Sequence, residues 1–231
     1  MKIASLFTGG KDSTYSLYKA MEEGYTPSVL VSMIPKKEGS YLYHSKNIKL
    51  TSLMSKSLDI DIFKSPSESE KNKEAEELKE ALEKAQNKYE FDTLGVGAIQ
   101  SKYQKTRVES ISKELGLNLY SPLWNVDIEE YMRNLIKEGF ESIITSVSAE
   151  GLDESFLGKK IDEEMLERLI DIKQKHKINL AGEGGEYETT VLDAPIFDKK
   201  IKIEDSELTY DENKMRGEYR IKKASLSQNG V

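Results

Sequence analysis

The sequence contains no cysteine, and this absence excludes several kinds of site at once. Without a thiol, the 231-residue chain cannot form a disulfide, a thiolate zinc or iron–sulfur site, a catalytic thiol or a persulfide carrier. Histidine is scarce as well. The only two, His44 and His176, are too few for a histidine-rich metal centre.

Long apolar runs and an excess of positive charge are also lacking. No segment approaches the ~20 apolar residues of a membrane-spanning helix, and the N-terminal apolar run of about five residues is too short for a secretory signal. Lys and Arg number 34 against 41 Asp and Glu, a net charge of -7. Because broad nucleic-acid binding needs a positive field, we expect no direct nucleic-acid binding, no membrane contact and a cytoplasmic location.

What is present is the pattern of a folded α/β protein. Residues 2–7 form a short apolar run, residues 13–23 have helical spacing, and residues 28–34 form a second run rich in β-branched side chains. A strand, a glycine turn, a helix and a strand in this order predict a βαβ unit and a parallel sheet.

The alternation of strands and helices weakens after Leu123. We therefore predict an α/β fold with a parallel sheet flanked by helices over residues 1–123 and a smaller C-terminal α/β domain over residues 124–231. Within the second part, we expect a strand at 178–181 and an exposed β-hairpin at 199–224.

The Lys- and Glu-rich stretch between residues 65 and 90 carries Ala75, Leu78, Leu82 and Ala85 on one helical stripe. This spacing predicts an amphipathic helix with one solvated face.

The first motif with chemical meaning is Thr8-Gly9-Gly10-Lys11-Asp12-Ser13, between the first strand and the first helix. Paired glycines let backbone N–H groups turn inward, and the helix N-terminus adds partial positive charge, so the segment predicts an anion cradle. It is not a Walker A loop, since Asp12 follows Gly-Lys where that pattern has Ser or Thr. The alternative is an ordinary strand–helix turn capped by Asp or Ser.

The second motif, Gly-Glu-Gly-Gly-Glu-Tyr-Glu at residues 182–188, places Glu183, Glu186 and Glu188 in what we expect to be one flexible loop after a strand. Neighbouring carboxylates repel one another, so this loop predicts a cation partner: Mg²⁺, ammonium or an organic cation. A solvated acidic turn is the alternative.

Residues 8–13 resemble the pyrophosphate loop of the N-type ATP pyrophosphatases, which transfer AMP to a carboxylate or carbonyl oxygen. This resemblance implies an adenine-nucleotide alpha-hydrolase-like (HUP-type) fold and the use of ATP and Mg²⁺. It also implies that backbone near Met33 contacts adenine, that Lys11 lies along the phosphates, and that Asp12 orients Mg²⁺ or the loop.

The segment GEGGEYETTVLDAP is similar to the hallmark of the diphthine–ammonia ligase (diphthamide synthase) family. Residues 41–45, 101–107 and 150–158 resemble that family too, with Phe156 where we expect Trp. The resemblance implies ATP-dependent amidation by ammonia of diphthine in translation elongation factor 2, giving diphthamide through an acyl-adenylate and releasing AMP and pyrophosphate.

The same resemblance assigns the site residues. As catalytic groups it implies Lys11, Asp12, Glu183, Glu186 and Glu188. For ATP binding it implies Thr8, Gly9, Gly10, Lys11, Asp12, Ser13, Met33 and Arg107. For the acceptor it implies His44, Tyr103, Gln104, Asp153, Glu154 and Tyr187.

Several alternatives stay open at this point. His44 could be a packed histidine, Arg107 a surface ion-pair partner, and Asp153 with Glu154 an N-terminal cap. The three glutamates could bind ammonium and take its proton, or hold the quaternary ammonium of diphthine. Modification of tRNA or of a small carboxylate, and a non-catalytic nucleotide sensor, are the competing functions, and a homodimer is left open.

The nitrogen source gives the first testable prediction. Because the chain has no cysteine to hydrolyse glutamine, ammonium salts should support product formation by the purified protein, whereas glutamine should not. The measurement is AMP release with either nitrogen donor, in preparations free of glutaminase and ammonia. Turnover with glutamine alone would contradict the prediction.

Overall fold

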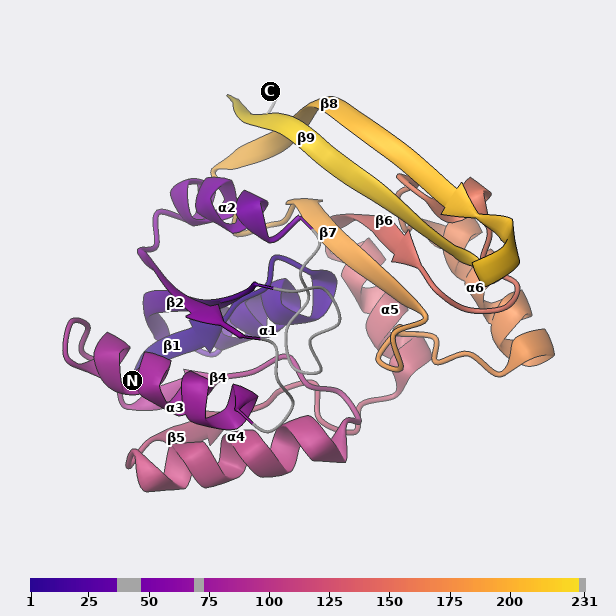
Figure 1. The fold of residues 1–231 in the computed structure, drawn as a ribbon. Coiled ribbons are helices and arrows are strands. Elements are labelled where there is room, and N and C mark those ends of the chain that lie inside the picture. The colour runs from indigo at the N-terminus through magenta and orange to yellow at the C-terminus, as the bar shows by residue number, and fades with distance from the viewer. Residues whose placement is uncertain (37–46, 69–72, 229–231) are drawn as a thin grey trace. The chain divides into compact units, whose positions relative to one another are not determined.

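The computed structural model describes residues 1–36, 47–68 and 73–228. By contacts between Cα atoms, the chain divides into two compact units, Met1–Trp124 and Asn125–Val231. Each unit is described here by itself (Figure 1).

The first unit contains a five-stranded sheet in which every neighbouring pair of strands is parallel. The order across the sheet is β3-β2-β1-β4-β5. The strands are β1 (Lys2–Leu6), β2 (Thr26–Pro35), β3 (Ile62–Ser67), β4 (Thr93–Gly95) and β5 (Asn118–Tyr120).

Helices cover both faces of this sheet (Figure 1). They are α1 (Lys11–Glu22), α2 (Thr51–Leu58, continuing the 3-10 turn η1, Ile48–Leu50), α3 (Glu74–Gln86) and α4 (Lys102–Glu114). Buried side chains of α3 and α4 pack with alternate residues of β1, β2 and β4 in one cluster that includes no residue of α1 or α2. Together with the all-parallel sheet, this arrangement confirms the predicted α/β class.

The charged helix is confirmed as amphipathic. In α3, the side chains of Leu78, Ala81, Leu82 and Ala85 are at most 2% exposed. On its other side, Lys79 pairs with Glu114 at 2.8 Å and Lys84 with Glu80 at 3.2 Å, all with exposed side chains. The helix therefore supplies core to the sheet on one side and faces water on the other.

The strand order creates a switch point between β1 and β4. The chain leaves β1 toward β2 on one side of the sheet, whereas β4 lies on the other side of β1. Because all five strands are parallel, the carboxyl ends of β1 and β4 open side by side at one edge. Ligands of such doubly wound sheets bind in the crevice at this position.

The second unit is built on a four-stranded antiparallel sheet in the order β7-β6-β9-β8. Its elements are α5 (Ile128–Lys137), β6 (Glu141–Val147), η2 (Glu154–Phe156), α6 (Glu163–His176), β7 (Tyr187–Asp193), β8 (Lys199–Asp211), η3 (Glu212–Lys214) and β9 (Arg216–Gln228). Both helices begin with an aspartate that accepts a backbone N–H bond, Asp127 in α5 and Asp162 in α6.

The prediction of a strand at residues 178–181 is wrong. This segment is a turn in which the Asn179 side chain accepts the N–H of Ala181 at 2.8 Å, and the Asn179 carbonyl accepts the N–H of Gly182. The strand begins later, at Tyr187. Asparagine competes for nearby backbone N–H groups, and this local bond replaces the sheet ladder. The Gly-Glu segment therefore precedes a strand, and Glu188 lies inside that strand.

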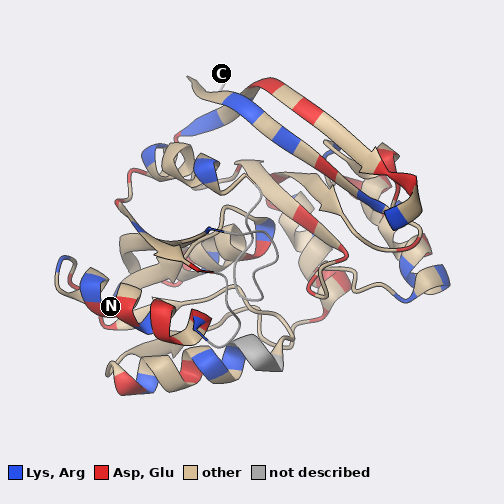
Figure 2. Ribbon diagram, viewed as in Figure 1, with Lys and Arg blue, Asp and Glu red and all other residues tan. Residues whose placement is uncertain are grey.

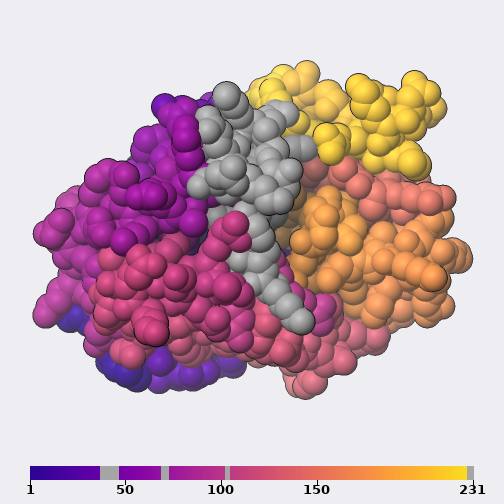
Figure 3. Space-filling model, turned by 60° about the horizontal axis from the view of Figure 1, so that its bottom comes forward, coloured from indigo at the N-terminus to yellow at the C-terminus, as the bar shows by residue number. Residues whose placement is uncertain are grey.

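The predicted C-terminal hairpin is confirmed, and it is long. β8 and β9 pair over 13-residue strands, while β9 meets β6 only through Gly217 and Glu218. Acidic residues of β8 face basic residues of β9 across the ladder (Figure 2), with Glu204–Lys223 at 2.6 Å and Glu207–Lys222 at 3.1 Å. Side chains of β9 stand at the surface of the second unit (yellow in Figure 3).

Among the described residues, no helix is both long enough and apolar enough to cross a membrane.

The packing of α3 generates the second prediction. Leu82→Ala removes a fully buried side chain from the cluster under the sheet, so the free energy of unfolding should fall by about 2–5 kcal/mol. The matched control is Lys84→Ala on the solvated face of the same helix, where the side chain is 62% exposed. Urea unfolding followed by circular dichroism gives both values, and equal stabilities for the two variants would contradict the packing.

Candidate functional site

The predicted anion cradle lies at the carboxyl end of β1, directly before α1. Gly9 adopts φ +78°, a backbone conformation that a side chain strains, and a Cβ there would lie 2.6 Å from the sulfur of Met54. Gly10 is the N-cap of α1 with extended backbone, and as a glycine it has no side chain with which to cap the helix. The loop thus brings the first N–H groups of α1 to the switch point, where an anion is favoured.

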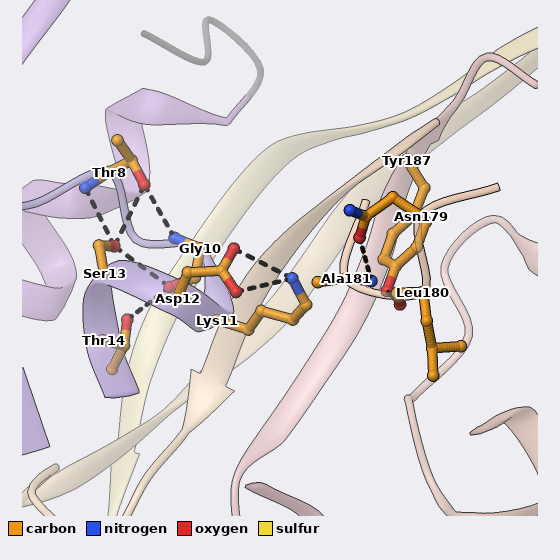
Figure 4. Close-up of polar contacts among 10 residues, drawn as sticks. All are labelled: Thr8, Gly10, Lys11, Asp12, Ser13, Thr14, Asn179, Leu180, Ala181 and Tyr187. Atoms are coloured by element: carbon orange, nitrogen blue, oxygen red, sulfur yellow. Dashed lines mark hydrogen bonds and ion pairs between the residues drawn. The ribbon is translucent and has the colours of Figure 1, made fainter. Parts of the chain in front are cut away.

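Hydroxyl groups hold this loop in shape (Figure 4). The N–H of Thr8 donates to Oγ of Ser13 at 3.3 Å, and Oγ of Ser13 donates to the carbonyl of Gly10 at 3.2 Å. Thr14 donates its hydroxyl to the same carbonyl at 2.9 Å. The Ser13 hydroxyl, which we expect beside the bound anion, is therefore also a support of the loop itself.

Lys11 and Asp12 form an ion pair in the first turn of α1. The ammonium of Lys11 donates to both carboxylate oxygens of Asp12, at 2.8 and 3.0 Å. The Lys11 side chain is 2% exposed and that of Asp12 is 31% exposed. An ammonium and a carboxylate are thus held together at the positive end of the helix, in the two residues that follow the Gly-Gly turn.

Met33 lies within β2 rather than after it, since this strand extends to Pro35. Its side chain is buried in the core cluster. The carbonyl of Val31 accepts a hydrogen bond from the N–H of Phe7, the residue that follows β1. Backbone groups of a parallel strand alternate in direction, so residues two apart point to the same neighbour. The backbone groups of Met33 therefore point, like those of Val31, toward the β1 side of β2. The register of β1 with β2 ends at Leu6 and Val31. The Met33 backbone groups thus face the space beyond the end of β1.

Four of the residues assigned to the acceptor or to ATP have few described contacts. Arg107 is half-buried in α4. Tyr103 and Gln104 also belong to α4, but their side chains, like the whole of His44, lie outside the described residues.

In the Gly-Glu segment, the carboxylate of Glu186 is occupied by the backbone. One oxygen accepts the N–H of Asn179 and the other accepts the N–H of Gly184, both at 2.8 Å. A Cβ at Gly184 would lie 2.7 Å from that carboxylate. The carbonyl of Glu186 accepts the N–H of Ser148. Glu186 therefore fixes the shape of the turn, a role that the sequence motif does not reveal.

The other side chains of the Gly-Glu segment differ from one another in burial. Tyr187 is 3% exposed, and its hydroxyl donates to the carbonyl of Leu180 at 2.5 Å, so its ring is part of the interior (Figure 4). Glu183 and Glu188 are half-buried. Among the described residues, no group of three His, Asp or Glu side chains could hold a metal ion. Residues 183–188 therefore form no three-carboxylate metal site, while binding of ammonium or an organic cation stays a prediction.

Asp153 is the predicted cap. Its side chain accepts the N–H of Ser155 at 2.9 Å and begins η2. The pKa of Asp153 is lowered, chiefly by its bond to the Ser155 side chain. Glu154, in the first turn of η2, is exposed. Phe156 is 2% exposed, and the guanidinium of Arg168 lies 4.2 Å from its ring centroid. The aromatic face at residue 156 is thus already paired with a cation of the same unit.

Gly97 and Asn179 are site-shaping residues that the sequence reasoning missed. Gly97 follows β4 at the switch point, and a Cβ there would lie 2.7 Å from the carbonyl of Asp12. A glycine directly after a buried strand was the available signal. Asn179 was hidden by an apolar neighbourhood typical of a strand.

The chain is similar to a single family along both units. The family model of the diphthamide synthase N-terminal domain matches residues 1–119, and that of the diphthamide synthase C-terminal domain matches residues 127–227. The diphthine–ammonia ligase of Rattus norvegicus is 33% identical over 226 residues, covering 90% of this chain and 84% of that protein. The diphthine–ammonia ligase of Homo sapiens is 32% identical over 227 residues, covering 90% and 85%.

A solved structure, a predicted subunit of tRNA methyltransferase from Methanocaldococcus jannaschii, is 18% identical with a TM-score of 0.44. It is matched over 84% of this chain and 98% of that chain, a likeness that carries no argument about activity.

The Glu186 contacts generate the third prediction. Glu186→Gln replaces one accepting oxygen by an amide that cannot accept an N–H bond, and a hydrogen bond to a charged group is worth about 1.5–3 kcal/mol. Amide hydrogen exchange in the 179–186 turn should therefore accelerate about tenfold or more. The control, Glu183→Gln, keeps both bonds. Equal exchange rates in the two variants would contradict the structural role of Glu186.

Proposed function

This chain belongs to the diphthamide synthase family, and we propose from this premise that it is an ATP-dependent diphthine–ammonia ligase. Its reaction is amidation of the diphthine carboxylate by ammonia to give diphthamide, with release of AMP and pyrophosphate. The protein that carries the diphthine is translation elongation factor 2. The observation that carries this proposal is the Gly-Gly loop that begins α1 at the switch point of the parallel sheet.

The chemistry explains why a nucleotide loop is needed. A carboxylate is a poor electrophile because its charge is delocalised and oxide is a poor leaving group. Its oxygen attacks the α-phosphate of ATP, pyrophosphate leaves, and the resulting acyl-adenylate has AMP as a good leaving group. Ammonia then forms the amide bond and AMP departs with the electrons of the broken C–O bond.

Residues of the first unit act on the leaving pyrophosphate. N–H groups at the start of α1 donate to its oxygens, and the ammonium of Lys11, buried beside the loop, adds positive charge where negative charge develops. The backbone groups of Met33, which face the space beyond β1, suit the polar edge of adenine. Thr8 and Ser13 keep the loop open for this purpose.

The Asp12 carboxylate fits a magnesium ion. Mg²⁺ is usually held by one or two carboxylates together with waters and substrate phosphates, so the lack of a three-carboxylate group among the described residues does not oppose it. Asp12 is partly exposed beside the phosphate loop. When bound, Mg²⁺ would neutralise phosphate charge. In the protein without bound nucleotide, the ammonium of Lys11 holds the carboxylate of Asp12 in place by a hydrogen bond.

The Gly-Glu segment serves the acceptor and the nitrogen donor. Ammonium has no lone pair, so a carboxylate must take its proton before attack. Glu183 and Glu188 are the groups proposed for this transfer or for holding the trimethylammonium of diphthine, whereas Glu186 acts by fixing the turn. Asp153 and Glu154 of the second unit complete the proposed acceptor contacts. A cytoplasmic location is consistent with a substrate of the translation apparatus.

The fourth prediction concerns Asp12. Purified protein, ATP, ammonium and elongation factor 2 in its diphthine form should yield AMP and diphthamide in equal amounts, and Asp12→Ala should lower this rate at least a hundredfold, about 2.7 kcal/mol on the barrier. The control is Asp61→Ala, an exposed carboxylate remote from the loop in sequence. AMP release is measured by chromatography and diphthamide by mass spectrometry.

Activity of Asp12→Ala within threefold of the unsubstituted protein would remove residues 8–13 from the reaction. ATP binding without AMP formation in the presence of the diphthine substrate would instead identify a nucleotide sensor. Mass spectrometry of elongation factor 2 from cells that lack the protein tests the substrate, because diphthine should accumulate there. Unchanged diphthamide would overturn the proposed function.

A further inference from the structure

The segment that follows β4 packs unusually close to the first turn of α1. A Cβ built on Gly97 would lie 2.7 Å from both the carbonyl carbon and the carbonyl oxygen of Asp12, and 2.8 Å from the amide nitrogen of Ser13. These are backbone atoms, which cannot rotate aside as the end of a side chain can. Only a residue without a side chain fits at position 97 while the loop keeps this position.

A hydrogen bond fastens the same two segments together. Ser16, one turn further along α1, donates its hydroxyl to the carbonyl of Val96 at 2.9 Å. Ser16 is 1% exposed and Val96 is 5% exposed. A buried bond of this kind is costly to break because the carbonyl would be left without a partner. Close backbone contact at Gly97 and the Ser16–Val96 bond thus join the β4 end to α1 at adjacent points.

The contact between Gly97 and the Asp12–Ser13 peptide lies at the anion cradle. The peptide between Asp12 and Ser13 belongs to the turn whose N–H groups form the anion cradle, and β4 is the strand across the switch point from β1. A displacement of about 1 Å in a positioning element is enough to change a rate about a hundredfold. Gly97 lies where such a displacement would be transmitted directly to the cradle.

We propose that Gly97, fastened by the Ser16–Val96 bond, is a positioning residue that sets the location of the phosphate loop relative to the end of β4. The proposal rests on the proposed function in one respect, that the loop binds the phosphates of ATP. Its structural part, the placement of the loop in the free protein, stands apart from that function.

The chain provides a matched control two residues earlier. Gly95 lies in β4 itself, and a Cβ there would meet the terminal carbon of the Ile3 side chain at 2.9 Å. This atom is the far end of a flexible side chain, so it can move. Gly97→Ala and Gly95→Ala therefore add the same methyl group to the same segment, but only the first pushes on the phosphate loop.

The experiment compares Gly97→Ala, Gly95→Ala and Ser16→Ala in the full chain. Titration calorimetry with α,β-methylene-ATP should show at least a tenfold weaker Kd for Gly97→Ala and an unchanged Kd for Gly95→Ala. In the free protein, amide hydrogen exchange over residues 10–14 should accelerate at least tenfold in Gly97→Ala and should be unchanged in Gly95→Ala. In the ligase assay, KM for ATP should rise while KM for ammonium stays constant.

Ser16→Ala keeps the test decisive if Gly97→Ala does not fold, because it removes the hydroxyl without adding volume. It should also accelerate exchange over residues 10–14 and weaken nucleotide binding. Unchanged exchange and unchanged Kd in the folded variants would overturn the proposal, as would equal effects in Gly95→Ala and Gly97→Ala. Failure of the unsubstituted protein to form AMP would overturn the proposed function, while the exchange measurement would still decide the placement of the loop.

Discussion

Parallel pairing of β1 with both β2 and β4 is the constraint on which the first unit depends. Parallel strands place all their carboxyl ends at one edge, and the reversal of strand order at β1 leaves that edge uncovered by a connection. The Gly-Gly turn, the start of α1 and the Val96–Gly97 segment meet there. We therefore expect an anion site at this edge, because the helix must begin where the strand has ended.

The charged side chains of the two predicted sites have different partners. At the phosphate loop, a buried ammonium and a partly exposed carboxylate are paired, so the cradle carries fixed positive N–H dipoles beside a group suited to a metal ion. In the Gly-Glu segment, backbone N–H groups occupy the Glu186 carboxylate. One carboxylate therefore holds the turn in shape, and the chemistry on a cationic partner that we propose is assigned to Glu183 and Glu188.

The proposed reaction needs both kinds of site. Adenylation requires stabilisation of negative charge on pyrophosphate, whereas amide formation requires a base for ammonium, and one group cannot supply both at the same pH. The family matches cover both units, at residues 1–119 and 127–227. The assignment of one role to each unit stays a prediction.

The sequence by itself determined the α/β class, the parallel sheet, the amphipathic α3, the Gly-Gly turn between β1 and α1 and the C-terminal hairpin, because each depends on local periodicity or on glycine next to a strand. It also determined the family, since several motifs stand in order. Only the tertiary structure decided which polar groups are occupied: the Glu186 carboxylate, the Ser13 hydroxyl and the Tyr187 hydroxyl all serve the fold. It likewise decided that residues 178–181 turn and that Gly97 touches Asp12. These outcomes depend on which backbone groups meet in space, a choice that residue spacing does not encode.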